Sequence, residues 1–131
     1  MTEKDRLIAY RLERARMSLV AAELLYNNKI YHDVYNRLYY ACFYAVSALL
    51  LNLGITAKTH AGLRSLFSQH VIHTGLLPKE CSNIYNDLIE AREETDYEDL
   101  IEPDPAKLRS WLPEVKRFID AIEQLITVCR Q

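Results

Sequence analysis

The sequence predicts an all-α protein, an antiparallel up-and-down bundle of four long helices and one short helix. Apolar residues recur every three or four positions in five separate segments, which is the spacing of one face of a helix. No segment shows the strict alternation of apolar and polar residues that is typical of a half-buried strand. The three glycines and four prolines stand near the points where these segments begin or end. Long helices joined by short connections pack naturally as an antiparallel bundle.

Residues 31–54 form the segment around which we expect the other helices to pack. Between Asp33 and Leu53 the chain has no proline or glycine, and apolar residues occupy nearly every side of the expected helix. A helix of this kind is buried on most of its sides, so Leu49 should lie in the core. The apolar run between Arg37 and Asn52 is too short and too polar to span a membrane.

The residues that start and stop helices define the other segments. Thr59 should cap the third helix and Gly75 should end it, while Asp33 and Gly54 should do the same for the central helix. Pro113 lies early in the last helix and should delay its start by a turn. The expected ranges are about Lys4 to Asn27, Asp33 to Leu53, His60 to Thr74, Pro78 to a frayed end within residues 93–100, and Asp104-Pro105 to Cys129.

Composition indicates a single domain over residues 1–131, because half of the residues are hydrophobic and can form a core. Cys42, Cys81 and Cys129 form no CxxC pair and have apolar neighbours, so we expect three reduced core thiols. The charged N-terminal segment has no apolar signal core. These features predict a cytoplasmic protein.

Charge is unevenly distributed, although the net charge is only −2. Residues 1–75 carry nine Lys and Arg against five Asp and Glu, a balance of +4, and residues 76–131 carry seven against thirteen, a balance of −6. A protein that binds nucleic acid over a broad basic surface has a stronger positive excess. Contacts with a polyanion should therefore be local and use a few arginines; the alternative is an ordinary solvated surface of mixed charge.

Two stretches in the first half of the chain carry candidate binding residues. Arg37, Tyr40 and Tyr44 share one helix face, where a buried Arg beside phenols could bind phosphate or carboxylate. Alternatively, the rings fill the core and Arg37 pairs with an acid of another helix. Lys58 and His60 open a helix whose free N–H groups favour an anion, or they belong to a well-capped helix start in which an acid satisfies His60.

A third stretch lies near the end of the fourth helix. Asp96 stands four residues after Arg92 and can pair with it across one turn, and Tyr97 follows. This group could place a guanidinium on a phosphate, or the pair could simply hold the helix end while Tyr97 covers it. We expect no metal site and no cofactor, because the four histidines lack the spacing of a zinc-binding helix and no Gly-rich phosphate loop is present.

Taken together, these stretches resemble the HEPN domain family (higher eukaryote and prokaryote nucleotide-binding), in its small stand-alone prokaryotic branch. The resemblance covers nearly the whole chain, in order and with compatible spacing. It rests on RLYYACFYA at residues 37–45, KTHAGL at 58–63, Phe67 leading to TGLLP at 74–78, and REETDY at 92–97.

The resemblance implies a helical bundle, commonly a homodimer, often encoded beside a minimal nucleotidyltransferase with which it forms a toxin–antitoxin pair. Many members are metal-independent ribonucleases that use an Arg and, four to six residues later, a His. In that arrangement Arg holds the scissile phosphate and His moves a proton near neutral pH.

This sequence departs from that pattern. Four residues lead from Arg92 to Tyr97, and a Tyr with an ordinary pKa near 10 is a poor base at pH 7. Arg64 and His70 have the bare spacing, but they lie in another helix and point about 240° apart around it.

Three hypotheses follow. In the first, a nucleotide or RNA phosphate binds to Arg92, Asp96 and Tyr97, supported by Arg37, Tyr40, Lys58 and His60, and the protein works with a nucleotidyltransferase partner. The second is a metal-independent ribonuclease toxin. The third is a non-catalytic dimeric interaction module.

Overall fold

The computed structural model describes the backbone of residues 1–97 and 103–129, and the side chains of these ranges except those of residues 94–97. Within these ranges the chain is helical and has no strand, as the sequence predicts. The elements in chain order are α1 (Glu3–Asn27), a 3₁₀ turn (Tyr31–Asp33), α2 (Val34–Asn52), α3 (His60–Phe67), a π-helical turn (Ser68–Ile72), α4 (Glu80–Tyr97) and α5 (Pro105–Cys129).

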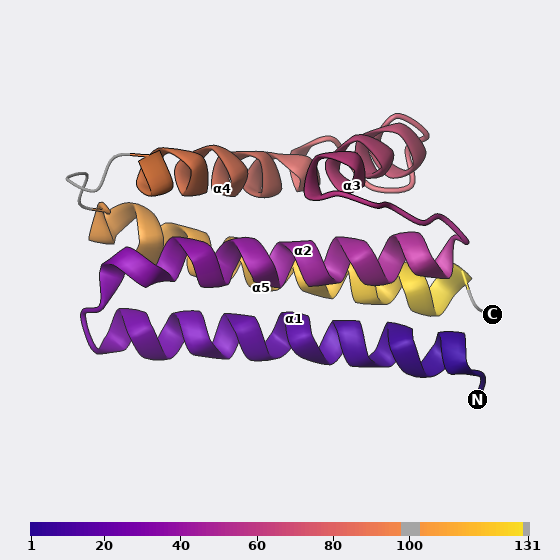
Figure 1. Ribbon diagram of the computed structural model, residues 1–131, viewed down its shortest axis with the longest axis horizontal. Helices are drawn as coiled ribbons and strands as arrows, with labels where there is room; N and C mark the ends of the chain where they lie inside the picture. The colour runs from indigo at the N-terminus through magenta and orange to yellow at the C-terminus, as the bar shows by residue number, and fades with distance from the viewer. Residues whose placement is uncertain (98–102, 130–131) are drawn as a thin grey trace.

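The helices form an up-and-down bundle with α2 near its middle (Figure 1). α1 and α2 run in opposite directions, α4 runs back along the other side of α2, and α5 returns beside α2. α2 packs against α1, α3, α4 and α5, whereas α1 and α4 lie on opposite sides of it. The predicted bundle of four long helices and a short one is confirmed, and the short helix is α3.

α2 is buried along most of its circumference. Eleven of its nineteen residues are buried, and Leu38, Ala41, Ala45 and Leu49 are fully inaccessible to solvent. This burial is the outcome that an almost uniformly apolar helix predicts. One line of α2 residues stays partly or fully exposed, and we call it the outer stripe: Arg37, Tyr40, Tyr44, Ser47 and Leu51.

The predicted ends at Gly54 and Gly75 both have a left-handed backbone conformation. Gly54 and Gly75 have φ values of 78° and 80°, a left-handed conformation that glycine adopts without steric cost. At the start of α3, Thr59 Oγ1 accepts a hydrogen bond of 2.9 Å from the Gly62 amide. A Cβ atom at position 62 would lie only 3.0 Å from that oxygen, so a glycine suits this cap.

The start of α2 and the end of α3 differ from the prediction. Asp33 makes no side-chain cap, because it belongs to the 3₁₀ turn that leads directly into α2. α3 ends at Phe67, and a π-helical turn continues to Ile72 where a regular helix to Thr74 is expected. This wider turn, closed by a 2.8 Å hydrogen bond from the His73 amide to the Ser68 carbonyl, holds Val71 fully buried.

Pro113 does not delay the start of α5. The helix begins at Pro105 because Asp104 accepts the Ala106 amide at 3.0 Å, and it then continues through Pro113. Pro113 is exposed, so water can satisfy the carbonyl that loses its helical donor.

The expectation of three core thiols is correct for Cys42 only. Cys42 is buried in α2, Cys81 is partly buried and Cys129 is exposed at the end of α5. Position 129 keeps the apolar spacing of α5, but the last buried residue of this helix is Ile126. None of the helices in the described ranges is long and apolar enough to cross a membrane.

We predict that Leu49→Ala lowers the free energy of unfolding by about 2–5 kcal/mol, because Leu49 is fully buried and the substitution leaves a cavity. Urea denaturation measures this change. Val128→Ala on α5 is the matched control, because Val128 is 59% exposed and its loss should cost less than about 0.5 kcal/mol. Equal effects of the two substitutions would contradict the central position of α2.

Candidate functional site

A pocket of about 540 Å³ lies where α2, α3 and α4 meet. We call it the Arg92 pocket. Its volume is within the range of small-ligand sites, roughly 300–1,000 Å³. Its lining residues are Tyr39 from α2, His60, Ala61, Arg64 and Ser65 from α3, and Ile89, Arg92 and Glu93 from α4.

Arg92 is held over two aromatic rings of α2. Its guanidinium carbon lies 4.6 Å from the centre of the Tyr39 ring and 5.4 Å from that of Tyr40. Each ring face attracts a cation, and together they fix the plane of the guanidinium. Arg92 Nε is buried and has no hydrogen-bond acceptor among the residues that the structure describes. An oriented guanidinium with an unused N–H group is suited to binding an anion.

His60 joins this site from the first position of α3. Its Nδ1 atom lies 2.8 Å from the Tyr39 hydroxyl, and its ring centre is 4.3 Å from that of Phe43. Burial, reinforced by the nearby positive charge of Arg92, holds the pKa of His60 below its ordinary value. The imidazole is therefore neutral at pH 7, and its Nε2 atom is the ring nitrogen not engaged by Tyr39.

Tyr39 connects the two side chains. Burial raises its pKa and outweighs the opposing effect of Arg92, so the phenol keeps its proton. A neutral phenol and a neutral imidazole can share their hydrogen bond in two ways. When Nδ1 donates, Nε2 has a free lone pair and can accept a proton; when the phenol donates, Nε2 carries a hydrogen and can donate to an anion. The Arg92 pocket thus places the permanent charge of Arg92 beside a group that can take or give a proton.

Two further residues, Tyr85 and Arg64, help to hold the side chains of the Arg92 pocket in place. Tyr85 stacks on Tyr39 with 6.4 Å between ring centres and is almost completely buried. Burial raises the pKa of Tyr85, so it also stays neutral. Arg64 Nε donates to Asn86 Oδ1 at 3.0 Å, which anchors a second guanidinium at the edge of the pocket.

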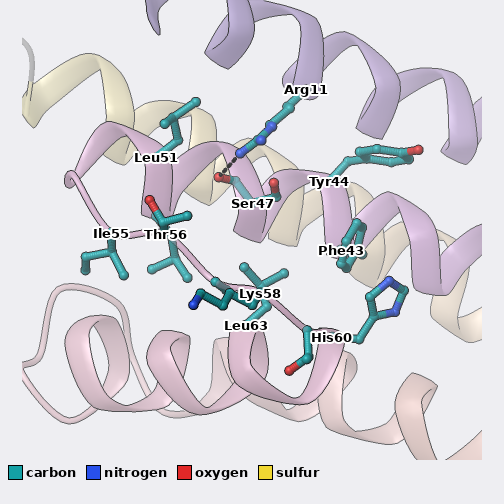
Figure 2. A pocket seen from close by; sticks show the side chains of 13 residues that line it. Arg11, Phe43, Tyr44, Ser47, Leu51, Ile55, Thr56, Lys58, His60 and Leu63 are labelled. Atoms are coloured by element: carbon teal, nitrogen blue, oxygen red, sulfur yellow. Dashed lines mark hydrogen bonds between the residues drawn. The ribbon is translucent and has the colours of Figure 1, made fainter.

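A second pocket, of about 400 Å³, lies on the other side of His60 (Figure 2). We call it the Arg11 pocket. Arg11 enters from α1 and donates to the Ser47 carbonyl of α2 at 3.2 Å, and Lys58 and His60 come from the opposite side. The remaining lining residues are Phe43, Tyr44, Ser47, Leu50 and Leu51 of α2, the segment 55–57, Thr59 and Leu63.

The structure brings together only part of the predicted site. Arg92, Tyr40 and His60 meet around Tyr39, and His60 separates Lys58 from Arg92. Arg37 is not buried as expected: like its neighbour Asn36 it is exposed near the start of α2, and it lines neither pocket. The side chains of Asp96 and Tyr97 lie outside the described residues, and their roles stay predictions.

His60 is satisfied by a phenol rather than by an acid, which the sequence did not indicate. Tyr39 is the principal residue that the sequence analysis missed as part of the site. The only feature of the sequence that pointed to Tyr39 is its position next to Tyr40, in a stretch that carries candidate binding residues. Within the described ranges, no group of three or more His, Cys, Asp or Glu side chains could hold a metal ion.

The family model of the HEPN domain matches residues 8–125. The chain belongs to the HEPN domain family. A UPF0332 protein of Thermotoga maritima is 40% identical over 126 residues, which cover 96% of each chain. Two proteins of Methanocaldococcus jannaschii carry names that begin "Putative toxin": one is 30% identical over 88% of this chain and 85% of its own, and the other is 38% identical over 70% and 62%.

In this HEPN chain a His lies near Arg92 in space, although not at the expected distance along the sequence. Tyr97 stands on α4 where the resemblance leads one to expect a His. His60, more than 30 positions earlier, borders the same pocket as Arg92. An imidazole is thus present beside the guanidinium, although it comes from α3.

We predict that Arg92→Gln raises the pKa of His60, because removing a nearby positive charge stabilises the imidazolium. The pKa should stay below the ordinary value, since Tyr39 and Phe43 still keep part of the water away from the ring. NMR titration of the His60 ring protons measures the shift. Arg64→Gln, at the edge of the same pocket, is the control and should change this pKa less; an equal or larger effect would mean that Arg92 is not the charge that acts on His60.

Proposed function

We propose that this HEPN protein binds the phosphate of a nucleotide or of RNA at Arg92, and that it acts as the toxin-like member of a pair with a minimal nucleotidyltransferase. The observation that carries the proposal is Arg92 itself, stacked on Tyr39 and Tyr40 with its buried Nε unpaired among the described residues. A phosphate oxygen could accept the hydrogen bond that Arg92 Nε can donate.

His60 adds to this binding chemistry. Because its pKa is lowered, a neutral imidazole can donate from Nε2 to a phosphate oxygen without adding a second full charge. Asp96, four residues after Arg92 on α4, is the residue that we expect to orient the guanidinium further. Lys58, on the other side of His60, increases the positive potential around the two pockets.

The partner and the assembly are proposed from relatives rather than from contacts. Two relatives are named as toxins, which supports a toxin-like role for this chain. The resemblance to the family supports a nucleotidyltransferase as the second component and a homodimer as the working form. Several apolar residues of α1 are exposed and are suited to contacts with another chain: Leu7, Tyr10, Met17, Val20 and Leu24.

We predict that Arg92→Ala abolishes binding of a short oligoribonucleotide, measured by titration calorimetry, while the fold is kept. The stability cost should not exceed about 2 kcal/mol, the usual size of a cation–π contact. Lys107→Ala on α5 is the matched control, because it removes a cation–π contact with Trp111, at 4.9 Å, away from the pocket. Undiminished binding in Arg92→Ala would contradict Arg92 as the phosphate site. A large loss of stability in the variant, without any binding by the wild type, would favour the non-catalytic interaction module.

A second function is favoured because Arg92 and His60 line the same pocket. A guanidinium and an imidazole are the two groups that a metal-independent ribonuclease needs. In this reaction His60 Nε2 takes the proton of a ribose 2′-OH, and the bond between phosphorus and O2′ forms while the bond to O5′ breaks. Arg92 stabilises the charge on the phosphate oxygens, and water supplies the proton that the departing O5′ takes up. The products are a 2′,3′-cyclic phosphate and a 5′-hydroxyl end.

For this second function we predict RNA cleavage in EDTA that is lost in both Arg92→Ala and His60→Gln. The value of kcat/KM should rise with pH through the pKa of His60, which lies below the ordinary imidazole value. His70→Gln, in the π-helical turn and outside the pocket, should retain full activity. Binding without cleavage by the wild type would leave phosphate binding as the function of the site.

A further inference from the structure

The Arg11 pocket has a charge pattern that the proposed function does not use. Two cations, Arg11 and Lys58, line it beside the neutral imidazole of His60, and neither Asp nor Glu is among its lining residues (Figure 2). Acidic residues outnumber basic ones in the chain as a whole, by eighteen to sixteen. A cavity lined by cations without carboxylates favours an anionic occupant.

Arg11 is oriented in this pocket but not neutralised. Its Nη1 donates to a backbone carbonyl, that of Ser47, and it forms no ion pair within the described part of the chain. It is partly buried, so its charge is incompletely hydrated. Arg16, further along α1, shows the contrast, because it pairs with both Asp120 and Glu123 of α5. The free charge of Arg11 is therefore available to a ligand.

Aromatic rings and arginines alternate along the outer stripe of α2 between the two pockets. Arg92 lies over Tyr40, and Arg14 of α1 lies over Tyr44 at 5.5 Å. The centres of the two tyrosine rings are 6.1 Å apart. His60 borders both pockets, so they adjoin. A line of partly exposed rings flanked by cations is the arrangement by which proteins bind single-stranded nucleic acid.

We propose that single-stranded RNA lies along the outer stripe of α2, with one phosphate on Arg92 and the adjoining nucleotide in the Arg11 pocket. This inference rests on the proposed function and extends it from one phosphate to a polynucleotide. A base packs against Phe43 and Tyr44, and its phosphate lies between Arg11 and Lys58. The ligand of this protein is then a strand rather than a free mononucleotide.

The test compares adenosine 5′-monophosphate with a six-nucleotide oligoribonucleotide, both titrated into the full chain. The wild type should bind the oligonucleotide about tenfold more tightly or better, which is the gain expected from one stacked base. In Arg11→Gln/Lys58→Gln this advantage should shrink to about threefold or less, because the adjoining phosphate loses both of its cations. The ratio of the two affinities allows for any effect of Lys58 on the mononucleotide itself. The slope of log K against log salt for the oligonucleotide should also become shallower, by about 0.7 for each phosphate that the variant no longer neutralises.

The control variant Arg6→Gln/Arg109→Gln makes the same change in net charge at two exposed positions outside both pockets. It should keep the preference for the oligonucleotide. Lys58→Gln alone, at an exposed position, should lower that preference even if Arg11→Gln disturbs the contact between α1 and α2.

The outcomes separate this inference from the function on which it rests. Equal affinity for the two ligands, or a double variant that behaves like the control variant, overturns the strand-binding inference alone, provided that Arg92→Ala still abolishes binding. If the wild type binds neither ligand, phosphate binding at Arg92 fails and the strand-binding inference fails with it.

Discussion

The structure depends on the burial of α2, a helix that is apolar on nearly all sides. Such a helix has no stable position except between other helices, so α1, α4 and α5 each place an apolar face against it. The outer stripe is left partly uncovered, and the Arg11 pocket lies over its C-terminal part. The Arg92 pocket lies next to it, since Arg92 spans from buried Tyr39 to half-buried Tyr40 of the stripe. The constraint that forms the core therefore also decides where a ligand can reach the chain.

The fold could be predicted from the sequence because its determinants are local and periodic. The lines Leu63, Phe67 and Val71 in the third helix region and Trp111, Val115 and Ile122 in the last are all buried. Thr59, Gly54 and Gly75 act at helix ends through geometry that depends only on a few neighbouring residues. The π-helical turn was missed because Val71 keeps the spacing of a regular helix after Leu63 and Phe67, so nothing in residues 68–72 distinguishes a wider turn from a continued α-helix.

The site was predicted less completely, and the reason is geometric. A pattern along one helix can show that Arg92 and Asp96 share a side, but it cannot show that Tyr39 and His60 meet Arg92 from two other helices. Arg37 was assigned a buried position because its helix is apolar all round, yet it is exposed near the start of α2. Arg11 gave no signal at all, since an isolated arginine on an amphipathic helix is normally only a solvated charge.

The covering of α2 by α5 has a consequence for the synthesis of the chain. Tyr39, His60 and Arg92 are all translated before α5, whose Trp111 packs edge-on against Tyr35 and whose Phe118 packs against Phe67 and Tyr85 under the site. Adding the 25 residues of α5 takes roughly 1–5 s at usual translation rates. During that interval α2 lacks one of the helices that cover it, and the rings of Phe67 and Tyr85 lack the Phe118 ring that packs on them. The arrangement of Tyr39, His60 and Arg92 should therefore become rigid only once α5 has packed under it.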